Sequence, residues 1–223
     1  YESAVIIQDG MRRMFQEGED VFYYLTVENE NYTHPAMPEG AEEGIRKGLY
    51  LLKEGAQGDR RVQLMGSGAI LREAMAAANI LEQDFGVQAD VWSATSFTEL
   101  RRDGVDCARW NRLNPEKQPR LPWINECLKD RQGPVIAATD YVRAYADQVR
   151  GFVPRDYIVL GTDGFGRSDT REKLRGFFEV DRYHIAYAAL YALYRKDQFS
   201  LGELTAAREA LSIDPSKANP VTE

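Results

Sequence analysis

Basic charge is scarce in this sequence of 223 residues, which carries 35 acidic against 28 basic residues and a formal net charge of −7. Duplex nucleic acid and anionic membranes both require concentrated lysine and arginine, so we expect neither as a primary partner. Long apolar runs are also missing, since no stretch approaches the ~20 residues that a membrane-spanning helix needs. The hydrophobic fraction of 43% is nevertheless ample for the core of a globular domain.

Cysteine and histidine occur only twice each, as Cys107, Cys127, His34 and His184. The cysteines lack CxxC spacing, which favours a reduced, cytosolic setting. No H-x-x-x-H or D-x-D-x-D-G cluster is present, so no metal site is predicted. We interpret His184, which lies in an apolar stretch, as a packed helix residue. We interpret His34 as a surface or interface residue; the alternative is that it reaches a neighbouring active site.

The signature motifs of several enzyme classes are absent. No G-x-S-x-G elbow supports a hydrolase, and the D-x-F-G pattern at Asp163 lacks the glycine-rich loop, strand lysine and H-R-D motif of kinases. We interpret residues 163–169 as a sharp turn that presents Phe165 and Arg167 for a structural or subunit contact. The alternative is a ligand site.

The turn Gly66-Ser67-Gly68 lacks the third glycine of a dinucleotide fingerprint and the lysine of a P-loop. It is predicted to be a plain tight turn between a strand and a helix. The alternative is that its backbone amides and the helix dipole hold a phosphate or another small anion.

The first 37 residues differ in pattern from the rest of the chain. Apolar residues recur at helical spacing from Ala4 to Phe15, which predicts a helix. Residues 21–27 are apolar and aromatic, which predicts a strand. One helix and one strand cannot supply the two packed layers of a domain core. We therefore expect residues 1–37 to be the tail of a preceding domain, with an N-terminal embellishment docked on the main domain as the alternative.

Strands alternate with helices after Arg61. Strands are expected at 62–65, 87–93, 135–138 and 157–160. Helices are expected at 69–81, from Thr95 or Ser96 onward, at 106–113, 123–128 and 140–149, and in three segments after Arg171. Gly86 and Thr139 or Asp140 are expected as helix caps. Such alternation predicts a three-layer α/β domain, with a mainly parallel sheet of about five strands and helices on both faces.

A proline-containing run, residues 29–44, comes after the expected first strand. Pro35 and Pro38 fix their own φ angles and bias the preceding residues to extended geometry. The run is therefore predicted to cross a surface as a semi-rigid strap.

Four segments in order, 29–44, 62–71, 93–104 and 160–169, resemble the carboxyl-terminal region of a known family. This is the homodimeric, thiamine diphosphate-dependent first component of the bacterial pyruvate dehydrogenase complex. The similarity runs from Tyr1 to Asn219. It implies a transketolase C-terminal-domain-like fold, in which residues 1–37 end a pyrimidine-binding domain and residues 42–223 form the transketolase-type C-terminal domain.

The resemblance also implies a function for the parent enzyme. That family oxidatively decarboxylates pyruvate on thiamine diphosphate with Mg²⁺, and passes the acetyl group to lipoamide on the dihydrolipoyl acetyltransferase core, as a cytoplasmic homodimer. Its Gly-Asp-Gly magnesium motif, activating glutamate and catalytic histidines lie upstream of this region, and no Gly-Asp-Gly occurs here. We therefore assign no catalytic, cofactor-binding or metal-binding residue to this chain, which is expected to be inactive alone and to stabilise the dimer. The alternative is a free-standing α/β module that binds a small anionic ligand at Gly66–Gly68.

Overall fold

The computed structural model describes all 223 residues and is built on one five-stranded sheet. The strands are β1 (Tyr50–Lys53), β2 (Arg61–Gly66), β3 (Gln88–Ser93), β4 (Val135–Ala138) and β5 (Tyr157–Leu160). Their order across the sheet is β1-β3-β2-β4-β5, and only β1 runs antiparallel to its neighbour. The predicted, mainly parallel sheet is confirmed; the antiparallel edge strand β1 is not among the predicted strands.

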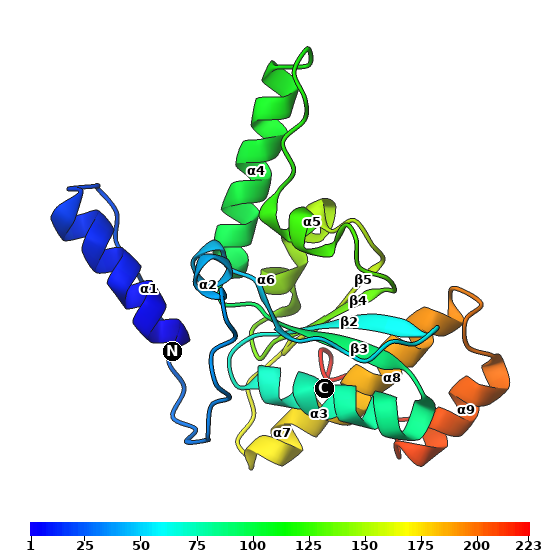
Figure 1. Cartoon of the computed structure of the whole chain (residues 1–223). Coiled ribbons are helices and arrows are strands. Elements are labelled where there is room, and N and C mark those ends of the chain that lie inside the picture. The colour runs from blue at the N-terminus through cyan, green and yellow to red at the C-terminus, as the bar shows by residue number, and fades with distance from the viewer.

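Helices cover both faces of this sheet (Figure 1). One face packs against α3 (Ile70–Phe85), α8 (Arg182–Tyr194) and α9 (Leu201–Ala210), with α7 (Arg171–Phe177) on the same side. The other face packs against α4 (Phe97–Leu113), α5 (Trp123–Leu128) and α6 (Arg143–Asp147). Successive residues of a strand point to opposite faces. Accordingly Leu64 joins the core under α3, whereas Met65 joins the core under α4. The three-layer architecture is confirmed.

Helix ends follow the local sequence in several places. Gly86 ends α3 in the left-handed conformation, with φ +63°, as predicted. The Ser96 side chain caps α4 by accepting a hydrogen bond of 3.1 Å from the backbone N–H of Glu99. The helix expected from Thr95 or Ser96 and the helix expected at 106–113 form one continuous helix, α4. A side chain at Gly104 would place its Cβ 2.4 Å from the Phe152 ring, so the glycine allows close packing there.

The helix expected at 140–149 is shorter than predicted. Only α6 (Arg143–Asp147) forms, followed by a 3₁₀ turn at Arg150–Phe152. The expected caps at Thr139 or Asp140 are wrong, since α6 begins after Val142 without a side-chain cap. Instead, the Thr139 hydroxyl accepts a hydrogen bond of 3.2 Å from the Tyr141 N–H. This local bond holds the β4–α6 connection in a turn and delays the helix.

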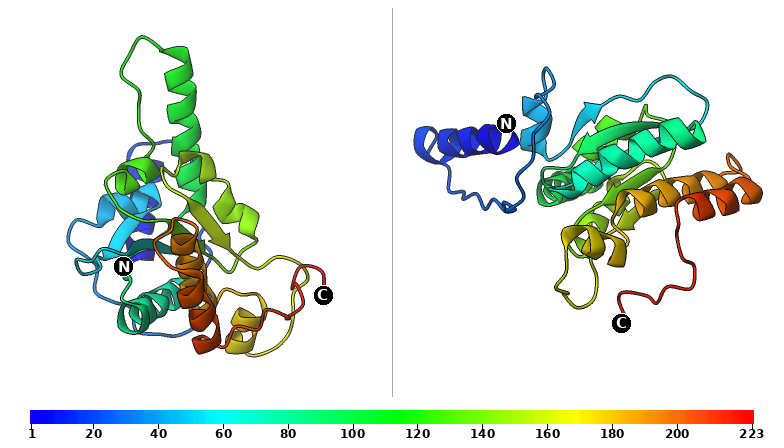
Figure 2. Two further views of the ribbon diagram at one scale, coloured as in Figure 1. Left: turned by 90° about the vertical axis from the view of Figure 1, so that its right-hand side faces the viewer. Right: turned by 90° about the horizontal axis from the view of Figure 1, so that it is seen from below.

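The N-terminal region forms α1 (Glu2–Met11) and a π-helical turn (Arg12–Gln16), then reaches α2 (Glu42–Lys47) through residues without helix or strand. Figure 2 shows α1 beside the α/β domain rather than within it. The strand predicted at 21–27 is wrong. No strand forms there, because no neighbouring strand supplies a hydrogen-bonded ladder to this segment. Phe22 and Tyr24 are each 86% exposed.

Candidate functional site at the carboxyl edge of the sheet

The carboxyl ends of the parallel strands β2, β4 and β5 meet at one edge, where ligand sites of open α/β sheets gather. The Gly66–Gly68 turn lies at this edge and leads into α3. Gly68 has φ +54°, a left-handed conformation that glycine adopts readily. The Ser67 hydroxyl lies 2.8 Å from the Thr139 hydroxyl and joins this turn to the end of β4.

The chain places one of its own carboxylates on this turn. Glu28 Oε1 accepts a hydrogen bond of 3.3 Å from the backbone N–H of Ala69, at the start of α3. A Cβ on Gly68 would lie 2.6 Å from the same oxygen, so the absence of a side chain at Gly68 lets Glu28 approach. The position at which the sequence allowed a small external anion is therefore filled by Glu28.

Asp140 faces Glu28 across this turn. Its Oδ1 atom is buried and accepts no hydrogen bond from an N–H or hydroxyl group. Burial, and then the neighbouring Glu28 carboxyl, raise the pKa of Asp140 to about 7. The two carboxyl groups are consequently arranged to share a proton near neutral pH.

Arginines surround a second carboxylate of the same segment. Glu30, with 16% of its side chain exposed, accepts hydrogen bonds of 2.9 Å from Arg72 and 2.7 Å from Arg175. Arg171 Nε lies 3.6 Å from Glu30 as well. Three guanidinium groups from α3 and α7 thus converge on one carboxylate.

Arg175 also contacts Glu73, the most deeply buried glutamate of the chain, at 3.4 Å. Arg182 forms a bidentate pair with Glu73, at 2.9 and 3.0 Å, and its backbone N–H donates a third bond of 3.0 Å. Burial opposes ionisation of Glu73, but the Arg182 hydrogen bonds outweigh it and hold the pKa of Glu73 below its usual value. The network is therefore ionised at neutral pH and ties α3 to α7 and α8.

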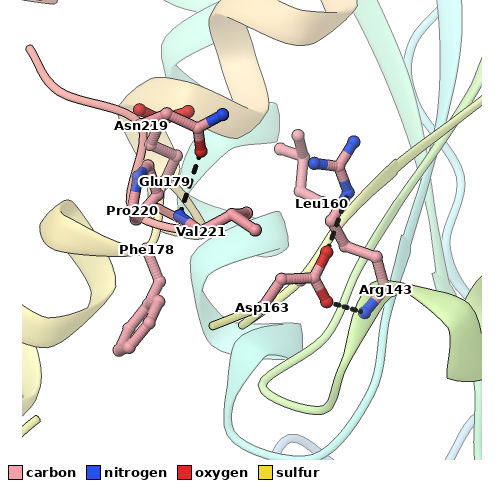
Figure 3. Close-up of a pocket in the computed structure, with 9 residues that line it drawn as sticks. Arg143, Leu160, Asp163, Phe178, Glu179, Asn219, Pro220 and Val221 are labelled. Carbon is pink, nitrogen blue, oxygen red and sulfur yellow. Dashed lines mark hydrogen bonds and ion pairs between the residues drawn. The ribbon is translucent and has the colours of Figure 1, made fainter. Parts of the chain in front are cut away.

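The loop 163–169 makes contacts within the chain. Arg143 Nε lies 3.7 Å from Asp163 Oδ2, and the Arg143 N–H donates to Asp163 Oδ1 at 2.9 Å (Figure 3). Arg167 lies over the Phe177 ring, 5.1 Å from its centroid, while Phe165 is 81% exposed. The loop borders a cavity of about 50 Å³ that is closed on the other side by Asn219 to Val221.

The two histidines and Cys127 each have different surroundings. His184 Nδ1 lies 2.7 Å from Asp181 in the first turn of α8, as expected for a packed helix residue. His34 is exposed and stacks on Tyr32, with ring centroids 4.7 Å apart. Burial raises the pKa of the Cys127 thiol to about 12, which makes it unreactive at neutral pH.

Thiamine diphosphate with Mg²⁺ does not fit the residues at the carboxyl edge of the sheet. No group of three histidine, cysteine, aspartate or glutamate side chains could hold a metal ion. The helix N-terminus at Gly68 carries a carboxylate, which repels a diphosphate. The 50 Å³ cavity is far below the ~300–1,000 Å³ of ligand pockets. A larger hollow of about 400 Å³ beside α6 contains Arg143 and Arg150, but both are paired with carboxylates of the chain.

Sequence reasoning missed the residues that matter most at this edge, namely Glu28, Glu30, Asp140, Arg72 and Arg175. The sequence pattern indicated Asp140 only as a helix cap. The only available signal was the alternation of two glutamates, Glu28 and Glu30, where the strap begins. The arginines gave none, since Arg175 and Glu30 are separated by 145 positions.

The fold is a three-layer α/β domain, and comparison with known families identifies its class. Residues 48–181, more than half of the chain, match the transketolase-like C-terminal domain, so the chain belongs to this family. Residues 1–35 match the middle domain of the pyruvate dehydrogenase E1 component.

Curated relatives make the identification more specific. The chain is 55% identical over 224 residues to a protein of Cupriavidus necator, 56% identical over 223 residues to one of Pseudomonas aeruginosa, and 54% identical over 224 residues to one of Escherichia coli K12. Each is named pyruvate dehydrogenase E1 component. The matches cover 99–100% of this chain but only 25% of each relative. The resemblance inferred from the sequence is confirmed, and the chain spans about a quarter of the length of these relatives.

Proposed function

We propose that this chain is the carboxyl-terminal quarter of a pyruvate dehydrogenase (acetyl-transferring), an oxidoreductase that decarboxylates pyruvate and passes the acetyl group to lipoamide. The observation that carries the proposal is the 54–56% identity, across the whole chain, to proteins named pyruvate dehydrogenase E1 component. In this proposal the parent is a cytoplasmic homodimer that works with a lipoyl-bearing dihydrolipoyl acetyltransferase core.

We also propose a division within the chain. Residues 1–37 end the middle, pyrimidine-binding domain, and residues 42–223 form the transketolase-type C-terminal domain. The two family matches, at 1–35 and 48–181, support a boundary in this region. The apolar residues of α1 and the following π-helical turn support it too, because Ile7, Met11 and Phe15 are 51%, 57% and 79% exposed and require further chain to cover them.

The role proposed for this region is structural: it stabilises the dimer and supplies no ligand to thiamine diphosphate or Mg²⁺. The poor fit of these groups to the residues present supports this role. The free-standing anion-binding module is disfavoured, because Glu28 occupies the Gly66–Gly68 turn.

The natural protein provides the decisive test. Its intact mass should be about four times that of this chain, as the 25% coverage of the relatives implies, and it should turn over pyruvate only with thiamine diphosphate and Mg²⁺. Calorimetry with this chain alone should detect no Mg²⁺-dependent binding of thiamine diphosphate. A natural protein of only 223 residues would refute the assignment, and micromolar cofactor binding to the chain would refute its non-catalytic role.

A further inference from the structure

The segment that carries Glu28 and Glu30 lies on the α/β domain without any backbone-to-backbone hydrogen bond to it. Residues 17–41 contain neither helix nor strand, and backbone hydrogen bonds join residues 20–41 only to near neighbours, at Val21 to Glu19, Ala41 to Pro38 and Ile45 to Ala41. In Figure 1 the segment loops from α1 past the start of α3 before it reaches α2. Side chains must therefore hold it in place.

Alternate side chains of the segment make these contacts. The Thr26 hydroxyl accepts a hydrogen bond of 2.6 Å from the Tyr141 hydroxyl. Glu28 accepts from the N–H of Ala69, Glu30 binds Arg72 and Arg175, and the Tyr32 ring lies 4.6 Å below the Arg72 guanidinium. An extended chain points every second side chain to the same side. The contacting side chains together form one recognition pattern, Thr-x-Glu-x-Glu-x-Tyr, at positions 26, 28, 30 and 32.

The intervening residues contribute less. Val27 is 82% exposed, and among residues 27, 29 and 31 only Asn29 forms a hydrogen bond with the domain, where Arg171 donates to its side-chain oxygen at 2.6 Å. We define the docking surface as Ala69, Arg72, Asp140, Tyr141, Arg171 and Arg175. It combines a helix N-terminus with three guanidinium groups, which are the features that bind carboxylates in proteins.

We propose that this docking surface is a recognition site for extended acidic segments of the pattern Thr-x-Glu-x-Glu-x-Tyr, occupied within the chain by residues 26–32. The site fixes the region that matches the middle domain onto the region that matches the C-terminal domain. Because no backbone ladder holds the segment, it can leave and return as a unit. The inference concerns binding alone and does not depend on the proposed catalytic function.

A shared proton makes this docking depend on pH. The charged groups that act on Asp140 are Glu28 from the segment and Arg175 from α7. The titratable Tyr141 follows Asp140 in the chain and donates its hydroxyl to Thr26, and the hydroxyls of Ser67 and Thr139 meet at the same turn. Burial and Glu28 raise the pKa of Asp140, so the docked state binds a proton that the undocked state gives up. Between about pH 4 and about pH 7 docking therefore weakens as the pH rises, and the effect of this proton levels off above the raised pKa.

A peptide offered in trans tests the recognition. The chain with Glu28→Gln and Glu30→Gln has a weakened segment of its own, and its fold is checked by circular dichroism. A fluorescent peptide of residues 24–34 should bind this variant in an anisotropy titration at pH 6. Binding to the unaltered chain should be at least about tenfold weaker, because the attached segment competes at a high effective concentration.

Matched controls define what would overturn the proposal. The peptide with both glutamates changed to Gln should bind about tenfold or more weakly, and Arg72→Gln, at a half-exposed side chain, should weaken the unaltered peptide similarly. Equal binding by the two peptides, or no binding of the unaltered peptide to the double variant, overturns the recognition site.

A second experiment tests whether the proton on Asp140 causes the pH dependence of docking. Affinity of the peptide for the double variant should fall about tenfold between pH 5.5 and 7.5. Adding Asp140→Asn, whose amide mimics the protonated carboxyl group, should keep the affinity high and remove this pH dependence. A pH dependence that survives Asp140→Asn shows that the proton lies elsewhere and refutes this part of the proposal.

Discussion

Arg175 joins two carboxylates that come from distant parts of the sequence. It donates to Glu30 at 2.7 Å and contacts Glu73 at 3.4 Å, with only 16% of its own side chain exposed. A partly buried guanidinium bound to two carboxylates is screened little by salt. At the scale of single residues, this pairing explains how a segment without secondary structure is positioned on a packed domain.

Glu73 should contribute to stability only while it is ionised. We expect Glu73→Gln to lower the free energy of unfolding by about 2 kcal/mol at pH 7, because buried hydrogen bonds from Arg182 lose their charged acceptor. The pKa of Glu73 is lowered in the folded chain, so its contribution is present above the unfolded pKa of about 4.5 and is lost as the pH falls through the folded value.

Urea melts at pH 7 and at pH 3.5 measure the effect of Glu73→Gln. The difference from the unaltered chain should shrink at the lower pH. Glu116→Gln, at an exposed loop position, serves as the control and should change the stability by less than about 0.5 kcal/mol. An equal loss at both pH values would show that Glu73 acts by packing rather than by charge.

Glycine is required at residue 133 for two reasons. Gly133 has φ +84°, and a Cβ there would lie 1.8 Å from the backbone oxygen of Arg61. Gly133→Ala should therefore cost about 3 kcal/mol or more, whereas Gly86→Ala, at φ +63° with nothing within 4 Å of the added Cβ, should cost about 1 kcal/mol. Thermal melts of the two variants provide the comparison, and equal losses would mean that φ alone sets the cost.

At the scale of elements, the sequence predicted the strands that are buried on both faces. Residues 135–138 are Val-Ile-Ala-Ala and are all buried, so a continuous apolar run was a reliable signal. Residues 21–27 gave a similar signal but form no strand. Whether an apolar segment pairs depends on a partner strand, and the local pattern contains no information about that partner.

The candidate site was less predictable than the fold, for a physical reason. The turn Gly66–Gly68 could be recognised because its glycines satisfy a local backbone requirement. Glu30 and Arg175 are ordinary surface residue types whose meaning comes from a contact across 145 positions. Local sequence patterns cannot report such contacts, so the ionic network emerged only with the three-dimensional arrangement.

The arm formed by α4 projects from the domain (Figure 1). Side chains of Trp110, Asn111 and Asn114 contact its return loop. Asn111 donates to the Arg120 carbonyl at 2.9 Å and accepts from the Arg120 N–H at 2.8 Å, while the Arg120 guanidinium lies 4.2 Å from the Trp110 ring centroid. Asn111→Ala should therefore release residues 114–121 and raise the rate of tryptic cleavage at Lys117 several-fold. The melting temperature should change little, because the loop contributes nothing to the buried core.

Gln118→Ala, an exposed position in the same loop, is the control for this effect on the arm. Cleavage at Lys117 should be the same in this control as in the unaltered chain. If Asn111→Ala left the cleavage rate unchanged, stacking of Arg120 on Trp110 would be sufficient to hold the loop.

At the scale of the whole molecule, protection from amide exchange should divide the chain unevenly. Residues 1–37 lie outside the sheet, and residues 20–37 lack a hydrogen-bonded ladder, whereas β2 and β4 are covered on both faces by helices of this chain. Hydrogen exchange at low protein concentration should be fastest within 1–37 and slowest in 62–65 and 135–138. Protection of 21–27 equal to that of 135–138 in a verified monomer would show that the first 37 residues are part of this domain.

The exposed apolar residues of the N-terminal region predict how the isolated chain behaves in solution. Ile7, Met11 and Phe15 lie at helical spacing from α1 into the following π-helical turn and are 51%, 57% and 79% exposed, and Phe22 and Tyr24 are 86% exposed. In the proposed parent enzyme the rest of the middle domain covers this surface. Without that cover, burial of the same side chains against a second copy is favourable, at about 25 cal/mol for each Å² of apolar surface removed from water. The chain should therefore self-associate as its concentration rises, which sedimentation velocity measures directly.

Met11→Glu with Phe15→Glu should shift the chain toward monomer, whereas Leu113→Glu, at a 58% exposed position on the α4 arm, should leave the association unchanged. A chain that stays monomeric at all concentrations, or that dissociates equally with Leu113→Glu, would show that the face of α1 is not the surface that requires cover.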